Sequence, residues 1–147
     1  MFDERRYFAS GRTAGGAAQA PCVFEVHGVR IGLLICEDAW FDEPAQAAVL
    51  AGAQVLCVLN ASPFHLDKAQ DREARMSECA RVHQRPLLYA HLAGGQDEVV
   101  FDGASFAVDG HGRLAVRGSS FEEGLVTVTL DDELTPLGII QPLPSPE

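Results

Sequence analysis

Residues 29–40, Val-Arg-Ile-Gly-Leu-Leu-Ile-Cys-Glu-Asp-Ala-Trp, carry the most informative pattern of the chain. The apolar run at residues 31–35 predicts a fully buried strand of a parallel sheet. The run stops at Cys36, and an alanine-rich segment that favours a helix comes after it. A sharp turn from strand to helix holds a side chain clear of the sheet, and helix N–H groups favour a thiolate and an oxyanion beside it. Cys36 is therefore a candidate nucleophile.

The alternative interpretation of Cys36 is a small buried residue that ends a core strand. Free cysteine is among the most buried residue types, which favours this interpretation. The two acids that follow, Glu37 and Asp38, argue against simple burial. On this pattern alone, both interpretations stay open.

Composition limits the class of protein. The 147 residues correspond to one domain or less, and their hydrophobic fraction of 47% is enough for a core. A net charge of −10 argues against a nucleic-acid partner or an anionic membrane surface. The sequence contains no apolar run near the roughly 20 residues of a membrane span, and no basic-then-apolar leader. The four cysteines lie far apart, which argues against a disulfide framework or a metal site. We expect a cytoplasmic protein without a metal.

The order of the elements predicts an α/β fold. A hairpin, a helix, a strand, a second helix and a further strand follow one another, at residues 22–35, 42–50, 53–59, 67–83 and 87–92. A strand, a helix and a strand in this order read as a unit with parallel pairing. Short antiparallel strands follow, among them residues 124–130 with one buried face. Residues 136–147 contain four prolines and are interpreted as an exit linker or tail.

Three polar loops follow predicted buried strands, at residues 36–38, 60–68 and 94–98. The carboxyl ends of parallel strands meet at one edge of a sheet, where α/β proteins usually place their sites. We therefore expect these loops to lie close together. This clustering favours Cys36 as a functional residue.

Four motifs carry a resemblance to a known family. They are Phe-Asp-Glu-Arg-Arg-Tyr-Phe at residues 2–8, Ile-Cys-Glu-Asp-Ala-Trp at 35–40, Asn-Ala-Ser-Pro-Phe at 60–64 with Lys68 and Arg72, and Gly-Gly-Gln-Asp-Glu-Val-Val-Phe-Asp-Gly-Ala-Ser-Phe at 94–106. In this order the motifs resemble the nitrilase, or carbon–nitrogen hydrolase, superfamily. The Gly-Gly-Gln-Asp-Glu run is similar to the glutaminase domains of bacterial glutamine-dependent NAD synthetases.

The resemblance implies a partial nitrilase-type αββα sandwich, in which a mixed sheet carries helices on one face. The chain is similar to the carboxyl-terminal half of that domain, over residues 1–135, with residues 136–147 as the tail. Such a piece is expected to leave sheet edges and apolar faces uncovered. We therefore expect a homo-oligomer.

The resemblance also implies a reaction. In the family, a cysteine thiolate attacks the side-chain amide of L-glutamine, a thioester forms, ammonia leaves, and water releases glutamate. Cys36 matches the nucleophile. Glu4 matches a second glutamate near the nucleophile, although a surface carboxylate is the alternative. The backbone N–H of Glu37 is expected in the oxyanion hole.

Further residues are expected around the substrate. Ser62 and Lys68 match positions that contact glutamine in the family, and the alternative for Lys68 is a solvated charge at a helix start. Asp38 and Trp40 are interpreted as structural supports of the turn. His91 occupies a position where the family usually has asparagine. Its imidazole can replace an amide donor, but its charge then depends on pH.

Several parts of the complete enzyme are expected outside this chain. The general-base glutamate and the oxyanion-stabilising lysine of the family precede the segment that starts at Phe2. The synthetase domain or subunit, our expected partner, would hold ATP, Mg and deamido-NAD, so we expect no cofactor in this chain. Two alternatives remain: a stand-alone nitrilase-like amidase for another small amide, and an inactive fragment that acts only in assembly.

Overall fold

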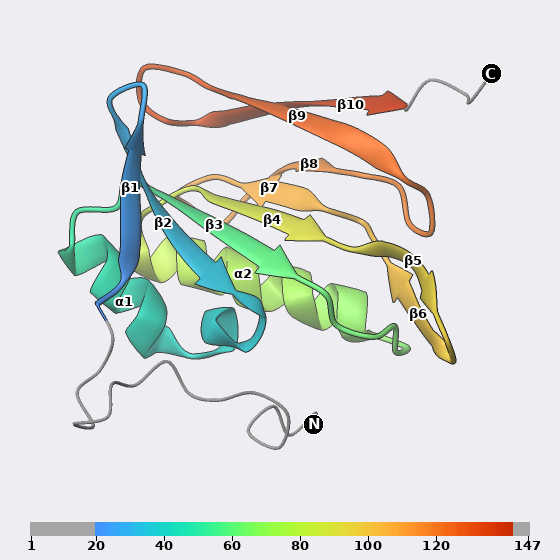
Figure 1. Ribbon diagram of the computed structural model, residues 1–147. Coiled ribbons are helices and arrows are strands. Elements are labelled where there is room, and N and C mark those ends of the chain that lie inside the picture. Colours follow the sequence, from blue (N-terminus) through green and yellow to red (C-terminus); the bar gives the residue numbers. More distant parts are fainter. Residues whose placement is uncertain (1–19, 143–147) are drawn as a thin grey trace, which may run out of the picture.

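A computed structural model describes the backbone of residues 20–142 and the side chains of residues 20–139. The elements in chain order are β1 (Cys22–Val26), β2 (Val29–Ile35), the 3-10 helix η2 (Cys36–Trp40), α1 (Asp42–Leu50), β3 (Val55–Asn60), α2 (Lys68–His83), β4 (Leu87–His91), β5 (Ala93–Gln96), β6 (Val99–Asp102), β7 (Phe106–Val108), β8 (Leu114–Arg117), β9 (Gly124–Leu130) and β10 (Pro136–Pro142). Six strands form one sheet in the order β1-β2-β3-β4-β7-β8, and α1 and α2 cover one of its faces (Figure 1).

The centre of the sheet is parallel and its two sides are antiparallel. β2, β3 and β4 run parallel to one another, whereas β1, β7 and β8 pair antiparallel with their neighbours. His27 and Gly28 form the first hairpin turn with φ of +48° and +81°. This arrangement confirms the predicted mixed sheet, and it brings the carboxyl ends of β2, β3 and β4 to one edge.

The core lies between the sheet and the helices. Its buried residues come from β2 to β4, β7 and the inner faces of the helices: Leu34, Leu56, Val58, Leu87, Tyr89, Phe106 and Val108 from the strands, and Ala45, Ala48, Met76, Cys79 and Ala80 from the helices. Small side chains let α1 lie close to the sheet. A Cβ atom on Gly32 would be 2.9 Å from the Cβ of Ala53 and 3.0 Å from that of Ala48.

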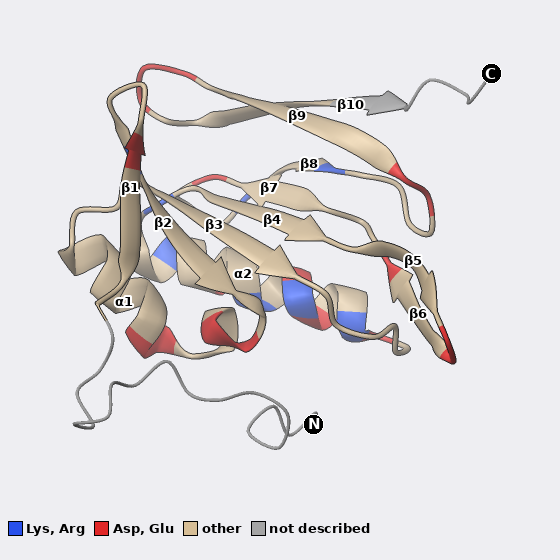
Figure 2. Cartoon of the chain, viewed as in Figure 1, with Lys and Arg blue, Asp and Glu red and all other residues tan. Residues whose placement is uncertain are grey.

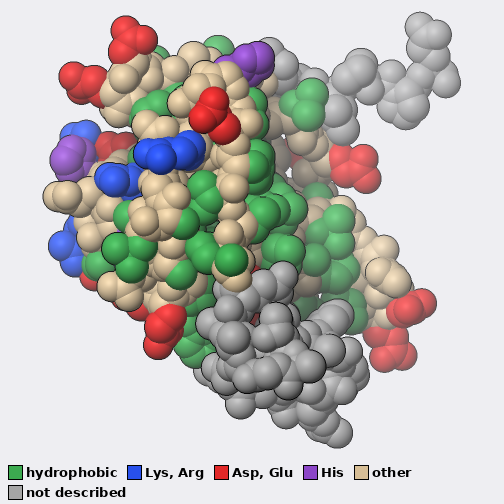
Figure 3. All heavy atoms as spheres, turned by 60° about the vertical axis from the view of Figure 1, so that its left-hand side comes forward, with side chains coloured by type: hydrophobic (Ala, Val, Ile, Leu, Met, Phe, Trp, Pro, Cys, Tyr) green, Lys and Arg blue, Asp and Glu red, His purple; other side chains and the backbone are tan. Residues whose placement is uncertain are grey.

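The prediction of a fully buried strand at residues 31–35 is wrong. Along β2 only Gly32 and Leu34 are buried, and Ile35 is 58% exposed. Leu59 on β3 is likewise 49% exposed. The helices cover one face of the sheet, and the β9–β10 hairpin lies over β7 and β8 rather than over β2 and β3. Figure 3 brings the side of β1 and α1 forward and shows hydrophobic side chains gathered across the middle of that view.

Two segments differ from the sequence prediction. Residues 94–98, expected as a polar loop, belong to the β5–β6 hairpin, whose turn contains Asp97 with φ of +52°. The start of the expected tail is strand β10, which pairs antiparallel with β9. Cross-strand hydrogen bonding there outweighs the turn preference of proline, because Pro136 and Pro142 stand only at the two ends of the strand. The predicted boundary between domain and tail stays a prediction.

Candidate functional site

Cys36 occupies a strained turn at the end of β2. Its φ is +51°, in the left-handed region that non-glycine residues seldom adopt. The Asp38 carboxylate closes the turn, since its Oδ2 accepts a hydrogen bond from the Ile35 N–H at 3.1 Å. The sharp turn expected of a nucleophile elbow is therefore present, with a half-buried thiol at its corner.

The helix predicted at residues 42–50 is confirmed as α1, and a short element that the sequence did not predict lies between it and the end of β2. η2 is a 3-10 helix of five residues, and the α-helix starts only at Asp42. A single short turn aligns fewer peptide dipoles than an α-helix, so it contributes less to thiolate stability than the sequence suggested. The geometry of the turn, rather than a long helix, distinguishes Cys36.

Lys68 lies against the end of η2, the element that begins at Cys36. It is the first residue of α2, and its Nζ lies 4.7 Å from the centroid of the Trp40 ring. An ammonium over an indole face is attracted by the ring quadrupole. This contact and partial burial argue against a freely solvated lysine. Basic side chains gather on α2, as Figure 2 shows, whereas acidic ones mark η2, the start of α1 and the β5–β6 turn.

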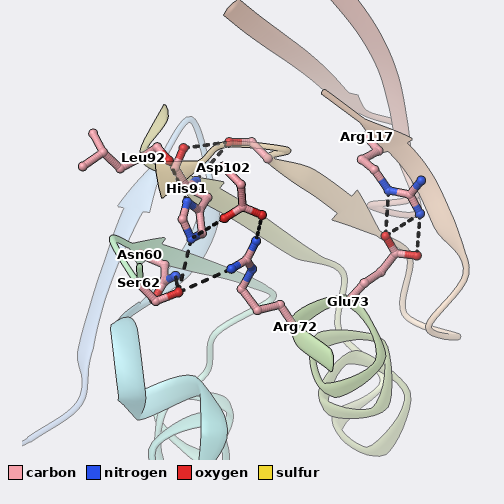
Figure 4. Close-up of polar contacts among 9 residues, drawn as sticks. Asn60, Ser62, Arg72, Glu73, His91, Leu92, Asp102 and Arg117 are labelled. Atoms are coloured by element: carbon pink, nitrogen blue, oxygen red, sulfur yellow. Dashed lines mark hydrogen bonds and ion pairs between the residues drawn. The ribbon is translucent and has the colours of Figure 1, made fainter. Parts of the chain in front are cut away.

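Ser62 stands at the centre of a polar cluster in the loop after β3. Its Oγ accepts a hydrogen bond from Asn60 Nδ2 at 3.1 Å and a longer one from Arg72 Nη1 at 3.5 Å. It also lies 3.3 Å from Nε2 of His91 (Figure 4). The Ser62 hydroxyl thus links β3, β4 and α2 at the edge where the parallel strands end.

An ion pair between Arg72 and Asp102 lies beneath this cluster. Both side chains are only 3% exposed. Oδ1 of Asp102 has no hydrogen-bond partner among the described residues, and it lies 4.0 Å from Nε2 of His91. From the sequence, Arg72 and Asp102 were named only as members of two motifs, and no ion pair between them was predicted. The available signal was the spacing of Arg72, which falls four residues before Met76 on the buried side of α2.

Burial changes the acid–base chemistry around the site. It lowers the pKa of His91, and the nearby Arg72 charge acts in the same direction, whereas the Leu92 carbonyl and Asp102 oppose it. Burial raises the pKa of Tyr89 far above its usual range. Burial also raises the pKa of the Cys57 and Cys79 thiols, which makes these two cysteines poor nucleophiles.

Of the two other residues predicted to be catalytic, the structure describes only Glu37. Glu37 follows Cys36 in η2 and is half-buried. Glu4 lies outside the described residues. Residues 20–142 contain no group of three metal-ligating side chains, and no helix among them is long and apolar enough to cross a membrane. The described part of the site therefore combines a thiol, an ammonium and a hydroxyl network, which suits a small polar substrate with an anionic end.

Comparison with known proteins identifies relatives of the whole chain. The carbon–nitrogen hydrolase family model matches residues 1–137. The glutamine-dependent NAD(+) synthetase of Xylella fastidiosa is 44% identical over 128 residues, which are 87% of this chain and 23% of that protein. The chain therefore spans about a quarter of the length of the curated relatives it matches.

Solved structures agree with these relatives. The glutamine-dependent NAD+ synthetase of Acinetobacter baumannii, in complex with ADP, is 33% identical with a TM-score of 0.81, covering 99% of this chain and 26% of that one. An amidase of Nesterenkonia sp. AN1, with acrylamide added at its active-site cysteine, is 26% identical with a TM-score of 0.64, covering 88% of this chain and 44% of that one. The sheet and helices described above thus have the nitrilase-type fold.

Proposed function

The chain belongs to the carbon–nitrogen hydrolase family, in a domain homologous to the glutaminase part of glutamine-dependent NAD synthetase, and we propose that Cys36 hydrolyses the side-chain amide of L-glutamine. The observation that carries this proposal is the geometry of the turn. Cys36 alone of the four cysteines combines a positive φ with a position at the carboxyl end of a parallel strand.

The proposed reaction proceeds through a thioester. The Cys36 thiolate attacks the amide carbon, and the oxyanion is held by the backbone N–H of Glu37. The C–N bond then breaks, and ammonia leaves with a proton from the general base. The general base then takes a proton from water, whose oxygen attacks the thioester carbon. The C–S bond breaks, glutamate is released, and the base returns that proton to the Cys36 sulfur. In this proposal the family's general-base glutamate and oxyanion lysine come from polypeptide outside residues 1–147, with Glu4 near the nucleophile.

Substrate selection is assigned to the neighbouring loop. The Lys68 ammonium, held over Trp40, is the proposed partner of the glutamine α-carboxylate, and Ser62 lies on the same edge. The ammonia would serve a synthetase domain or subunit that binds ATP, Mg and deamido-NAD. The similarity to synthetases that are about four times longer supports this assignment.

A second candidate function is hydrolysis of another small amide. The likeness to the Nesterenkonia amidase favours it, since that protein also carries a reactive cysteine on this fold. Competition separates the two candidates. L-Glutamine protects Cys36 from a thiol reagent in the first case, whereas propionamide protects it equally well in the second.

The decisive experiment is labelling with a diazoketone analogue of L-glutamine, followed by peptide mass mapping. We expect labelling of Cys36 at least about tenfold above Cys22, because Cys22 is exposed and responds only as a general thiol. Excess L-glutamine should suppress labelling of Cys36 alone. Equal labelling of the two cysteines would refute the proposal.

The matching variants are Cys36→Ala and Cys22→Ala. We expect Cys36→Ala to abolish ammonia release from L-glutamine, because no other thiol lies at the turn, while Cys22→Ala keeps the parental rate. The assay includes the polypeptide that supplies the general-base glutamate and the oxyanion lysine, because the proposed mechanism requires both. Ammonia release by Cys36→Ala at the parental rate would remove the thioester mechanism.

A further inference from the structure

The hydrogen bonds of His91 define its tautomer. Its Nδ1 lies 2.8 Å from the carbonyl oxygen of Leu92, which can only accept a hydrogen bond. Nδ1 must therefore carry the hydrogen. In the neutral imidazole, Nε2 then has a free lone pair and can only accept.

The Ser62 hydroxyl is saturated by its neighbours. A hydroxyl has one hydrogen and two lone pairs. Asn60 Nδ2 and Arg72 Nη1 both donate to Oγ, so they occupy the lone pairs. The remaining contact, to Nε2 of His91 at 3.3 Å, must be a donation from the Ser62 O–H. Figure 4 shows these groups pointing toward one another from β3, β4 and α2.

From this saturation we propose that His91 is a positioning residue for Ser62: the neutral imidazole holds the hydroxyl hydrogen inside the protein, and protonation of His91 releases it for a bound ligand. The ligand class is the carboxylate or amide of a glutamine-like molecule, so this inference rests on the proposed function. When His91 is neutral, Ser62 is a structural link between strands and donates nothing to the substrate.

Protonated His91 has a second acceptor in reach. Oδ1 of Asp102 is buried, unpartnered among the described residues, and 4.0 Å from Nε2. In the imidazolium, Nε2 carries a hydrogen, and this hydrogen and that of the Ser62 hydroxyl cannot both lie between the two groups. The Nε2–H therefore turns to the carboxylate oxygen of Asp102. The Ser62 hydroxyl keeps its two donors and is free to donate outward.

The groups that face His91 act in both directions. Arg72 from α2 opposes its protonation, whereas the Leu92 backbone, Asp102 from β6 and the Ser62 backbone favour it. Tyr89 precedes it on β4, and its ring lies 6.1 Å from the imidazole. Ser105 accepts a hydrogen bond from the His91 backbone N–H at 2.9 Å. Glu122 and Glu123 line a small hollow together with His91, and they add negative charge on that side.

The first test is NMR of the chain labelled with ¹⁵N-histidine. Of the five histidines, His91 is assigned by the loss of its signals in His91→Asn. We expect the Nδ1–H tautomer at alkaline pH, and a shift of the Nε2 resonance in Ser62→Ala. The exposed His111 provides the control, since His111→Asn should leave the His91 signals unchanged. An Nε2–H tautomer at alkaline pH, or an Nε2 chemical shift that stays the same in Ser62→Ala, would overturn the inference.

The second test measures how well L-glutamine protects Cys36 from a thiol reagent. It is run at pH values below and above the midpoint of the His91 titration, which is determined by the same NMR experiment. We expect Ser62→Ala to weaken protection about tenfold below the midpoint, because a hydrogen bond to a charged ligand is lost, and less than about twofold above it. His91→Asn should remove this pH dependence. Ser120→Ala, at an exposed serine in an isolated bridge with Gly103, should retain it. Equal effects of Ser62→Ala at both pH values would refute the inference. If the glutamine analogue does not label Cys36 at all, the proposed function fails. The NMR result still decides the role of His91 in that case.

Discussion

At the scale of single residues, we expect substitution to cost the most stability at the Arg72–Asp102 ion pair, because both side chains are buried. Asp102→Asn keeps the shape of the side chain but leaves the Arg72 charge without compensation. We expect the free energy of unfolding to fall by about 3–5 kcal/mol, measured by urea denaturation.

The control for Asp102→Asn is the Glu73–Arg117 pair, drawn beside it in Figure 4. It joins the same helix to β8, and its side chains are 26% and 50% exposed. Solvent screens such a pair, so Glu73→Gln should cost about 1 kcal/mol or less. Similar losses for the two variants would show that burial does not decide the strength of the Arg72–Asp102 pair.

His91 gives stability a pH dependence. Its pKa in the folded chain is lowered from the ordinary value of 6.5 by burial. Between these two pKa values the unfolded chain binds more protons, so the free energy of unfolding falls as pH falls through 6.5 toward the lower pKa of the folded chain. The loss is at most about 1.4 kcal/mol per pH unit for one proton.

The variant His91→Asn lacks this titration. Urea denaturation across the same pH range should therefore give it a smaller slope of stability against pH than the parent. His111→Asn, at an exposed histidine, is the control substitution. Equal slopes for the parent and His91→Asn would contradict the assignment.

At the scale of elements, the sequence predicted what local patterns encode. The hairpin turn at His27-Gly28, the helix from Asp42 to Leu50 and the parallel order of β2 to β4 all follow from turn residues and hydrophobic spacing. The exposed face of β2 did not, because burial depends on what covers a sheet. The β5–β6 hairpin did not either, because β5 consists of Ala93, two glycines and Gln96 and has no hydrophobic alternation. The strained turn at Cys36 was predicted, and the buried Arg72–Asp102 pair was missed because it joins distant segments.

The packing of β2 against α1 depends on Gly32. A methyl group there meets Ala53 and Ala48 at 2.9 and 3.0 Å, inside normal contact. Gly32→Ala should therefore lower the free energy of unfolding by about 1–3 kcal/mol in urea denaturation. In Gly95→Ala the new Cβ finds its nearest neighbour at 3.7 Å, so stability should change by less than about 0.5 kcal/mol. A neutral Gly32→Ala would mean that α1 moves away from the sheet without loss.

At the scale of the whole molecule, the two faces of the main sheet are unequal. The helices bury one face, whereas Phe24, Ile35 and Leu59 on the other are 44%, 58% and 49% exposed. Their strands are neighbours, and Ile35 pairs with Leu59, so these side chains form a shared apolar surface. Water contact with such a surface is unfavourable, and association removes it.

We therefore expect the chain, alone in solution, to associate through this face of β1, β2 and β3. Sedimentation velocity should show a mass that rises with concentration. Leu59→Lys places a charge in the surface and should raise the dissociation constant about tenfold or more, since a buried leucine contributes about 1.5–3 kcal/mol. Leu50 on α1 is 81% exposed and lies on the helix side, so Leu50→Lys is the matched control and should leave association unchanged. A parent that stays monomeric, or equal effects of the two lysine variants, would show that the open sheet face is not what brings copies of the chain together.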